Sequence, residues 1–425
     1  MKYAWINGII LDGTKDMEPV RGKIVLTEGS WIKDIIADEQ VPQGYEIIDL
    51  KGQYLMPGLI NLHVHLPAGG KPKKKESDPI KLVKWVSSNA LFRYAAKRLC
   101  AANARKQLMS GVTTIRTMGG ILDFDSAVRE MSEHGKELPR ILASNMAVSV
   151  PGGHMAGSLA YEAKSVEEVI ADVRAIIKTH PNVVKLMITG GVLDAKEKGE
   201  PGALKMPGEF VKAACEEAHR HGLPVAAHVE SPQGVKAALE NGVDTIEHGA
   251  EIDEACIELF LSNKAAHVAT LSPALPFALF DRSISHVSQT AQYNGKIVFE
   301  GIIACAKACL KAGIPVGLGT DTGCPYVTHY DMWRELHYFH KYCDVSNRFA
   351  LHSATQVNAR IAGIGDLTGV IMAGKAADLI VTKENPLEDL SALRSISMVC
   401  TRGKLIKAPK VKKIKQVEEQ LDRYL

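Results

Sequence analysis

The chain has 425 residues, of which 46% are hydrophobic and 23% are charged, and its formal net charge is +3. Such a length and apolar content can bury the core of one large domain and a smaller one, as in an ordinary soluble globular protein. The charge is too small to indicate a nucleic-acid partner, and no apolar run approaches the roughly 18 residues that would cross a membrane, so we expect neither kind of partner.

The cysteines and the N-terminus indicate a reducing compartment. The eight cysteines lack the paired spacing of a metal finger, so we expect reduced and mostly buried thiols. The N-terminus has no long apolar run followed by a small-residue cleavage site, as a secretory signal would have. We therefore expect a cytoplasmic protein.

Residues 1–55 are predicted to form short β-strands. An Asn-Gly turn at 7–8 separates two apolar runs there. Runs of the same character recur near the other end of the chain, at 374–381 and 397–406. Because neither part can bury its apolar faces alone, we expect the two parts to pair in one small β-sandwich.

The predicted domains follow from this pairing. The sandwich takes residues 1–55 and 372–409, and the main domain takes residues 56–371 between them. The last segment, 410–425, has helical spacing and mixed charge, and we expect it to form a surface helix without a chemical role.

Within the main domain, short apolar runs alternate with longer helical patterns. The expected strands lie near 58–65, 111–118, 140–147, 183–188, 224–229, 244–248, 265–270 and 314–319. The expected helices lie at 79–110, 165–180, 207–221, 231–241, 252–263, 295–313 and 346–362. This repetition predicts an α/β fold, a (β/α)8 TIM-like barrel, whose active site would lie at the C-terminal ends of the strands.

Potential metal ligands stand at or just inside several of these strand ends. They are His63, His65, Lys185, His228, His248 and Asp321. His63 and His65 are two residues apart in a strand and would face the same side. Among 15 histidines such a pair could arise by chance, but its recurrence with ligands at other strand ends indicates a shared site.

Imidazole and carboxylate ligands suit Zn²⁺ or a similar divalent ion, and positions left open for water are typical of a catalytic site. Without a thiol cluster, we do not expect a purely structural zinc. Lys185 is the unusual member of the set. Its stem could pack on the barrel while its charge reaches water. Alternatively, a desolvated lysine near metals could lose its proton and react with carbon dioxide, giving a carbamate able to bridge two ions.

The chain resembles the amidohydrolase superfamily, and within it the imidazolonepropionase-like and prolidase-like group, which hydrolyses amide bonds of small molecules and dipeptides. The motifs that carry the resemblance are MPGLINLHVH at 56–65, GVTTIR at 111–116, VKLMITGG at 184–191, AH at 227–228, IEHG at 246–249, GTDTG at 319–323 and GKAADL at 374–379. They are spread over most of the chain.

The resemblance implies a centre of two divalent ions, usually zinc. By this resemblance, His63, His65 and Asp321 would hold one ion and His228 and His248 the other. Carboxylated Lys185 would bridge the two ions together with a hydroxide. Asp321 would also be the proton shuttle, taking the proton of the attacking hydroxide and passing it to the leaving amine.

Three further residues are candidates for substrate binding. His154 ends a Pro-Gly-Gly-His loop after the third strand. A histidine in such a loop is often only a surface residue, but the resemblance implies a catalytic contact with the substrate carbonyl or carboxylate. Arg116 and Glu230 mark departures from the group, because Thr117 follows Arg116 where the group often has Asp, and Glu230 stands near where prolidase-like members often have an aromatic residue.

The main hypothesis is a metal-dependent hydrolase of an amide bond in a small molecule, such as a dipeptide or an N-acyl amino acid. Hydrolysis of a cyclic amide or deamination of a heterocycle is the alternative, but mononuclear relatives that do this generally lack the lysine on the fourth strand. A non-catalytic scaffold would be expected to lose ligands, and all six are present. We also expect a homo-oligomer.

A basic run at Lys71–Lys75 follows the first barrel strand. It could be a solvated connection. It could also be a lid, hinged at Gly69 and Gly70, that attracts substrates with a free carboxylate.

Overall fold

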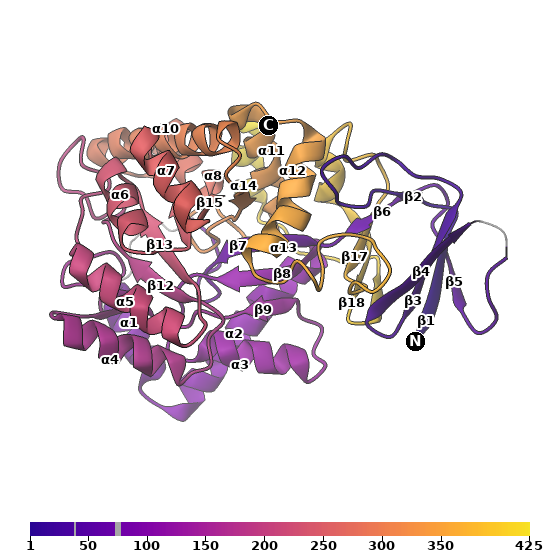
Figure 1. Ribbon diagram of the computed structural model, residues 1–425, viewed down its shortest axis with the longest axis horizontal. Coiled ribbons are helices and arrows are strands. Elements are labelled where there is room, and N and C mark those ends of the chain that lie inside the picture. Colours follow the sequence, from indigo (N-terminus) through magenta and orange to yellow (C-terminus); the bar gives the residue numbers. More distant parts are fainter. Residues whose placement is uncertain (38–39, 73–77) are drawn as a thin grey trace.

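The computed structural model describes residues 1–37, 40–72 and 78–425. It consists of a β-sandwich and a larger α/β barrel, which lie side by side in Figure 1. The lysines at 73–75 of the predicted lid lie outside the described residues.

The sandwich is built from both ends of the chain. One sheet has the order β4-β3-β1-β5, with β1 (Lys2–Ile6), β3 (Lys23–Glu28), β4 (Trp31–Ala37) and β5 (Glu46–Asp49). The second has the order β19-β18-β17-β6-β2, with β2 (Ile9–Ile10), β6 (Tyr54–Pro57), β17 (Leu379–Thr382), β18 (Ile396–Thr401) and β19 (Lys404–Lys407). Trp5 and Val25 share one buried core with Leu379 and Cys400, so the expected small β domain made from both termini is confirmed.

The barrel strands are parallel and follow one another in chain order. They are β7 (Leu59–Val64), β8 (Val112–Thr117), β9 (Arg140–Leu142), β10 (Ala147–Ser149), β12 (Val184–Met187), β13 (Val225–Val229), β14 (Thr245–His248), β15 (Ala266–Ala269) and β16 (Val316–Leu318). The third barrel position is divided between β9, which pairs with β8, and β10, which pairs with β12 and with the short β11 (Ala160–Glu162).

The barrel closes between its last and first strands. The amide of Asp321 donates to the carbonyl of His63 at 2.8 Å, and the amide of His65 donates to the carbonyl of Thr322 at 3.0 Å. The predicted TIM-like barrel is therefore confirmed. Closure also places Asp321 beside the two histidines of β7, although they lie at opposite ends of the barrel sequence.

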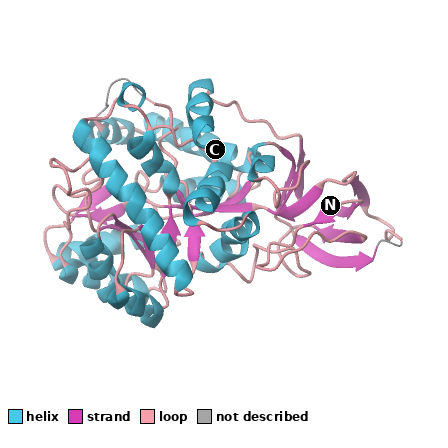
Figure 2. Ribbon diagram, turned by 90° about the horizontal axis from the view of Figure 1, so that it is seen from above, coloured by secondary structure: helices cyan, strands magenta, loops and turns pink. Residues whose placement is uncertain are grey.

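Helices enclose the strands in both views (Figures 1 and 2). They are α1 (Pro79–Ser87), α2 (Ala90–Met109), α3 (Phe124–Glu133), α4 (Val166–Ile177), α5 (Gly208–Arg220), α6 (Pro232–Glu240), α7 (Glu254–Asn263), α8 (Leu271–Leu279), α9 (Arg282–Ser285), α10 (Gln289–Lys311), α11 (Met332–Cys343), α12 (Asn347–His352), α13 (Asn358–Ile361) and α14 (Lys415–Leu421). Short 3₁₀ turns occur at Leu390–Arg394 and Asp422–Tyr424.

Local sequence explains where several helices begin. Ser165, Ser231 and Ser288 each accept a hydrogen bond from a backbone amide in the first turn of the following helix. Such a cap stabilises a helix by about 1 kcal/mol. Asn89 does the same for α2, which divides the helix predicted at 79–110 into α1 and α2.

The helix prediction was wrong in other places. Helices α3, α8, α9 and α11 were not expected, and α10 begins at Gln289 rather than near 295. The helix expected at 346–362 is interrupted by a π-helical turn at Ser353–Val357.

The cysteines are free thiols, and all of them lie within the described part of the chain. Cys324 is partly exposed and the other seven are buried. In the described ranges, no helix is both long enough and apolar enough to cross a bilayer.

Candidate metal centre

Four histidines converge at the C-terminal ends of the barrel strands. His63 lies on β7 and His65 directly after it, His228 lies on β13, and His248 is the last residue of β14. The ring centroids of His63 and His248 are 4.9 Å apart, and those of His228 and His248 are 4.7 Å apart. All four imidazoles are buried.

The ligand-type atoms form two groups, each with atoms within 4.8 Å of one another. The groups are His63, His65 and Asp321, and His228, Glu230 and His248. Glu230 was predicted as a substrate contact, and the structure places its carboxylate in the second group, where it is also a candidate ligand. Its role in substrate binding stays a prediction.

The first two histidines are held with one nitrogen free. Nδ1 of His63 donates to Oε2 of Glu247 at 2.7 Å, and Nδ1 of His65 donates to the carbonyl of Gly119 at 2.8 Å. Burial lowers the pKa of His63 to about 4, so this imidazole is neutral near pH 7. In both residues Nδ1 is engaged by a protein acceptor, so Nε2 is the nitrogen that a metal ion would use.

The other two histidines are arranged in the same manner. Nε2 of His228 lies 3.4 Å from the carbonyl of Gly190, which leaves Nδ1 free, and Nδ1 of His248 is hydrogen-bonded to Thr270 Oγ1 at 2.6 Å, which leaves Nε2 free. Burial holds the pKa of both imidazoles well below the ordinary value. Both are therefore neutral and able to bind a metal ion.

Asp321 is held in a strained backbone conformation beside them. Its φ is 53°, in the left-handed region that costs energy for most residues. A Cβ at Gly319 would lie only 2.5 Å from Cβ of His63, so glycine is needed for this close approach to β7. The tight path brings Oδ1 of Asp321 to 3.1 Å from Nε2 of His65.

That short separation brings together two potential ligand atoms, Nε2 of His65 and Oδ1 of Asp321. Ligands that share one ion at roughly 2.0–2.1 Å in tetrahedral geometry stand about 3.3 Å apart. The contact therefore fits a shared divalent cation.

Lys185, on β12, is buried beside these groups. Its side chain is 1% exposed, which rules out the interpretation in which its charge reaches water. Nζ has no hydrogen-bond partner among the described residues. Burial lowers its pKa to about 8, so at pH 7 about a tenth of the amine is neutral.

Three buried polar atoms at the centre lack hydrogen-bond partners within the described ranges: Nζ of Lys185, Oδ1 of Asp321 and Oε2 of Glu230. Leaving polar or charged groups unpaired in a protein interior is unfavourable, and for a charged group the cost is several kcal/mol. Divalent ions would satisfy the carboxylates, and a carbamate would turn the amine into a further oxygen ligand. The residues present therefore fit a two-ion centre.

Glu247 was not among the predicted site residues, although it is fully buried behind His63. Its Oε1 accepts from Nη2 of Arg116 at 2.7 Å, while Oε2 accepts from His63. Burial alone would raise the pKa of Glu247, but Arg116 and His63 hold it well below the ordinary value. An acid inside an apolar strand, as in Thr-Ile-Glu-His at 245–248, was the available signal.

Arg116 is buried as well, and the partners of its guanidinium are protein groups. Nε donates to the carbonyl of Leu62 at 2.9 Å, and Nη2 donates to Glu247. In the structure Arg116 therefore positions Glu247 and, through it, His63. A substrate contact by Arg116 stays a prediction.

Replacing Glu247 with glutamine should weaken both the fold and the centre. The buried Arg116 would lose its counter-charge, and breaking such a pair costs about 3–5 kcal/mol. The loss of this support for His63 should also lower metal affinity about 10–100-fold. Denaturant unfolding of metal-free protein and metal titration would measure the two effects. Glu251→Gln, at an exposed position shortly after this strand, is the control. Equal stability of the two variants would contradict the supporting role of Glu247.

His154 reaches the centre from the loop after β10. Its ring stacks on that of His228 with 4.2 Å between centroids, and its Nδ1 lies 2.6 Å from Oδ2 of Asp194. Asp194, which the sequence did not single out, also accepts from the amide of Gly191. A cavity beside it is lined by a mixture of acidic and basic residues, namely Asp194, Lys196, Glu197, Glu200 and Lys205, together with Gly190 and Gly191.

Comparison with known proteins identifies the family of the chain. The model of the Amidohydrolase family matches residues 54–406. The crystal structure of a candidate prolidase from Bifidobacterium longum is 33% identical, with a TM-score of 0.88, and the match covers 99% of this chain and 98% of that one. The crystal structure of a Xaa-Pro dipeptidase with bound methionine in the active site is 26% identical, with a TM-score of 0.82, covering 96% and 100%. Ochratoxinase from Aspergillus niger is 27% identical over 443 aligned positions, covering 95% of this chain and 86% of that protein.

Proposed function

The chain belongs to the amidohydrolase family, and from this premise we propose that it is a binuclear metal-dependent hydrolase that cleaves the amide bond of a dipeptide or N-acyl amino acid. The observation that carries the proposal is the pair of ligand groups beside the buried, unpartnered amine of Lys185. The lysine supports a binuclear centre over the mononuclear cyclic-amide hydrolase or deaminase.

In this proposal, the two groups would hold two divalent ions such as Zn²⁺, and Lys185 would contribute a carbamate. His63, His65 and Asp321 would hold one ion, and His228 and His248 would hold the second, where Glu230 is an additional carboxylate within reach. When bound, such ions lower the pKa of a water molecule and polarise the scissile carbonyl.

The chain's own residues then manage the proton and the substrate. Asp321 accepts the proton of the attacking water and returns it to the leaving amine. His154, paired with Asp194 at 2.6 Å, can donate from Nε2 to a carbonyl or carboxylate oxygen when it is protonated. The stacking of His154 on His228 keeps this donor next to the second group.

Two observations support a dipeptide as the substrate class. One relative is named as a Xaa-Pro dipeptidase. The cavity next to His154 also carries charges of both signs, with Lys196 and Lys205 facing the same space as Glu197 and Glu200. A dipeptide has a free ammonium and a free carboxylate, so both of its ends could find opposite charges there.

We expect zinc-loaded protein to hold about two divalent ions in this centre. To count them, wild-type protein is compared with a double variant in which His65 and His248, one ligand of each group, are replaced with alanine. Elemental analysis gives the metal content of both proteins, and the difference is the number of ions in the centre. A binuclear centre would be contradicted if the difference were one ion and wild-type protein with a single ion in the centre were fully active.

A substrate screen tests the specificity separately. Dipeptides should be hydrolysed faster than the same compounds with an acylated amine, and cyclic amides should be poor substrates. Protein stripped of metal by a chelator is the control for spontaneous hydrolysis. Preferential opening of cyclic amides, or release of ammonia from heterocycles, would overturn the proposed substrate class while leaving the metal centre intact.

A further inference from the structure

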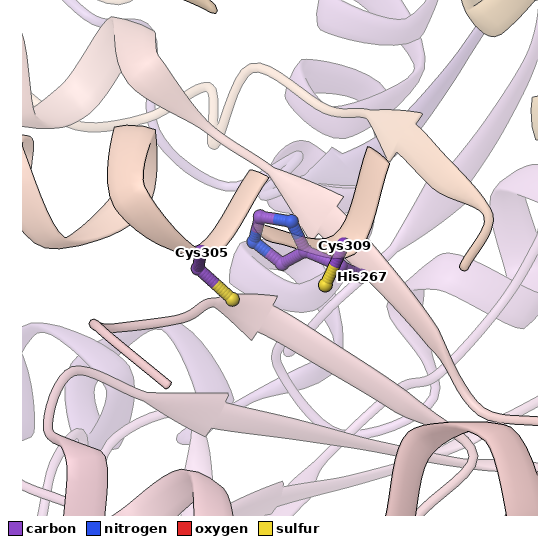
Figure 3. A group of neighbouring side chains, drawn as sticks. All are labelled: His267, Cys305 and Cys309. Atoms are coloured by element: carbon purple, nitrogen blue, oxygen red, sulfur yellow. The ribbon is translucent and has the colours of Figure 1, made fainter. Parts of the chain in front are cut away.

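A second cluster of side chains of metal-ligand type lies behind the centre, between β15 and α10. His267 is on β15, and Cys305 and Cys309 are one turn apart on α10. One ligand atom of each lies within 4.8 Å of the others, and all three residues have 0% exposure. Figure 3 shows the imidazole between the two sulfur atoms. None of them takes part in the hydrolysis proposed above.

The hydrogen bonding of His267 leaves one of its ring nitrogens without a partner among the described residues. Its Nε2 donates to the carbonyl of His248 at 2.7 Å, so the proton sits on Nε2 and Nδ1 carries the lone pair. Nδ1 is buried and has no hydrogen-bond partner in the part of the chain that the structure describes. A buried acceptor left in this state costs about 1–3 kcal/mol. Histidines that bind metals are typically oriented by such a bond from the other ring nitrogen.

We propose that His267, Cys305 and Cys309 bind a thiophilic metal ion, Zn²⁺, at a site separate from the binuclear centre. Two thiolates and a neutral imidazole balance the two positive charges of Zn²⁺, which suits a fully buried position. Cu⁺ accepts the same ligands but would leave a net negative charge in the interior. Binding releases the two thiol protons to solvent.

The position of this cluster gives the ion a structural role. A Cβ at Gly249 would lie 2.9 Å from both Sγ of Cys305 and Nε2 of His267. Glycine therefore lets the cluster pack directly against the chain segment after His248, whose own φ is 66°. An ion held by the cluster would fix the backbone that carries this ligand of the binuclear centre.

Cobalt substitution tests the site without using activity. Co²⁺ bound by thiolates has a sulfur-to-metal charge-transfer band in the near ultraviolet, which nitrogen and oxygen ligands cannot produce. Protein expressed in cobalt medium should show this band, and the His65→Ala/His248→Ala variant should keep both the band and one ion per chain. The test would therefore give the same result if the proposed binuclear centre did not exist.

Matched cysteine variants identify the thiolates that produce the band. Cys305→Ser and Cys309→Ser should each weaken or abolish it, whereas Cys324→Ser, at the thiol near Asp321, should leave it unchanged. If the serine variants do not fold, the spectrum of the wild-type chain decides. The proposal would be overturned if wild-type protein lacked the band, or if the band persisted in both serine variants. It would also be overturned if Cys324→Ser lost the band, or if protein grown with both metals contained copper in place of zinc.

Discussion

Replacing Lys185 with alanine should remove most of the metal from the binuclear centre and nearly all of the hydrolytic activity. Lys185 is 1% exposed, and its amine has no hydrogen-bond partner among the described residues. The substitution therefore breaks no hydrogen bond within that part of the chain. What the variant loses is the carbamate, the ligand proposed to serve both ions. Metal analysis and kcat on the best substrate of the screen measure the two losses.

Three comparisons separate this role from a structural one. Lys185→Arg should not restore activity, because a guanidinium cannot form the carbamate. Short carboxylic acids should partly rescue Lys185→Ala by supplying a carboxylate in the vacated space. Lys236→Ala, at an exposed lysine, should behave as wild type. Wild-type metal content and activity in Lys185→Ala would show that the lysine is not a ligand.

The same residue should affect stability in the opposite direction. A buried amine whose pKa falls to about 8 carries a desolvation cost in metal-free protein, since it is mostly charged at pH 7. Lys185→Met keeps the volume and removes this cost, so the metal-free variant should unfold at higher denaturant concentration than metal-free wild type. Lys185 would then lower the stability of the metal-free protein while enabling it to bind metal.

The predicted ligands could be found from sequence because they obey a local rule of the fold. In a parallel barrel, the residue at the C-terminal end of each strand faces the shared opening. His63, His228, His248 and Asp321 each stand at or near the end of a short apolar run. The structure brings them together, and it also shows that closing the barrel puts Asp321 next to His63.

The residues that sequence reasoning missed depend on contacts between distant elements. Glu247 matters because its two oxygens connect His63 with Arg116, which no spacing within one strand reveals. The cluster of His267 with Cys305 and Cys309 joins a strand to a helix. The two cysteines are close in sequence, but their spacing does not connect them with a histidine on another element.

Two of the missed helices, α3 and α11, have local explanations. Helix α11 (Met332–Cys343) is rich in aromatic and histidine residues, which have modest helix propensity, and its buried face is set by tertiary packing. Helix α3 (Phe124–Glu133) is short and contains Asp and Ser near its start, a composition equally typical of a loop.

Replacing Asp321 with asparagine should lower kcat by about 10²-fold or more, the usual scale for a positioned acid or base, while metal binding largely remains. Asparagine tolerates a positive φ better than most residues, so it can occupy this position at φ 53°, and its amide oxygen can still approach an ion. It cannot accept a proton and return it to the leaving amine. The expected signature is therefore a fall in kcat with little change in KM or in metal content.

The choice of substitution decides what this experiment can show. Asp321→Ala would remove a ligand and strain the backbone at the same time, whereas Asp321→Asn isolates the proton transfer. Asp344→Asn is the matched control, because Asp344 also has a positive φ, 58°, and is exposed. Loss of the rate with an unchanged pH–rate profile would move the base to another group, and Glu230 is then the candidate, since its carboxylate lies with His228 and His248 and Oε2 has no partner in the described ranges. Retention of both the rate and the profile would show that Asp321 acts only as a metal ligand.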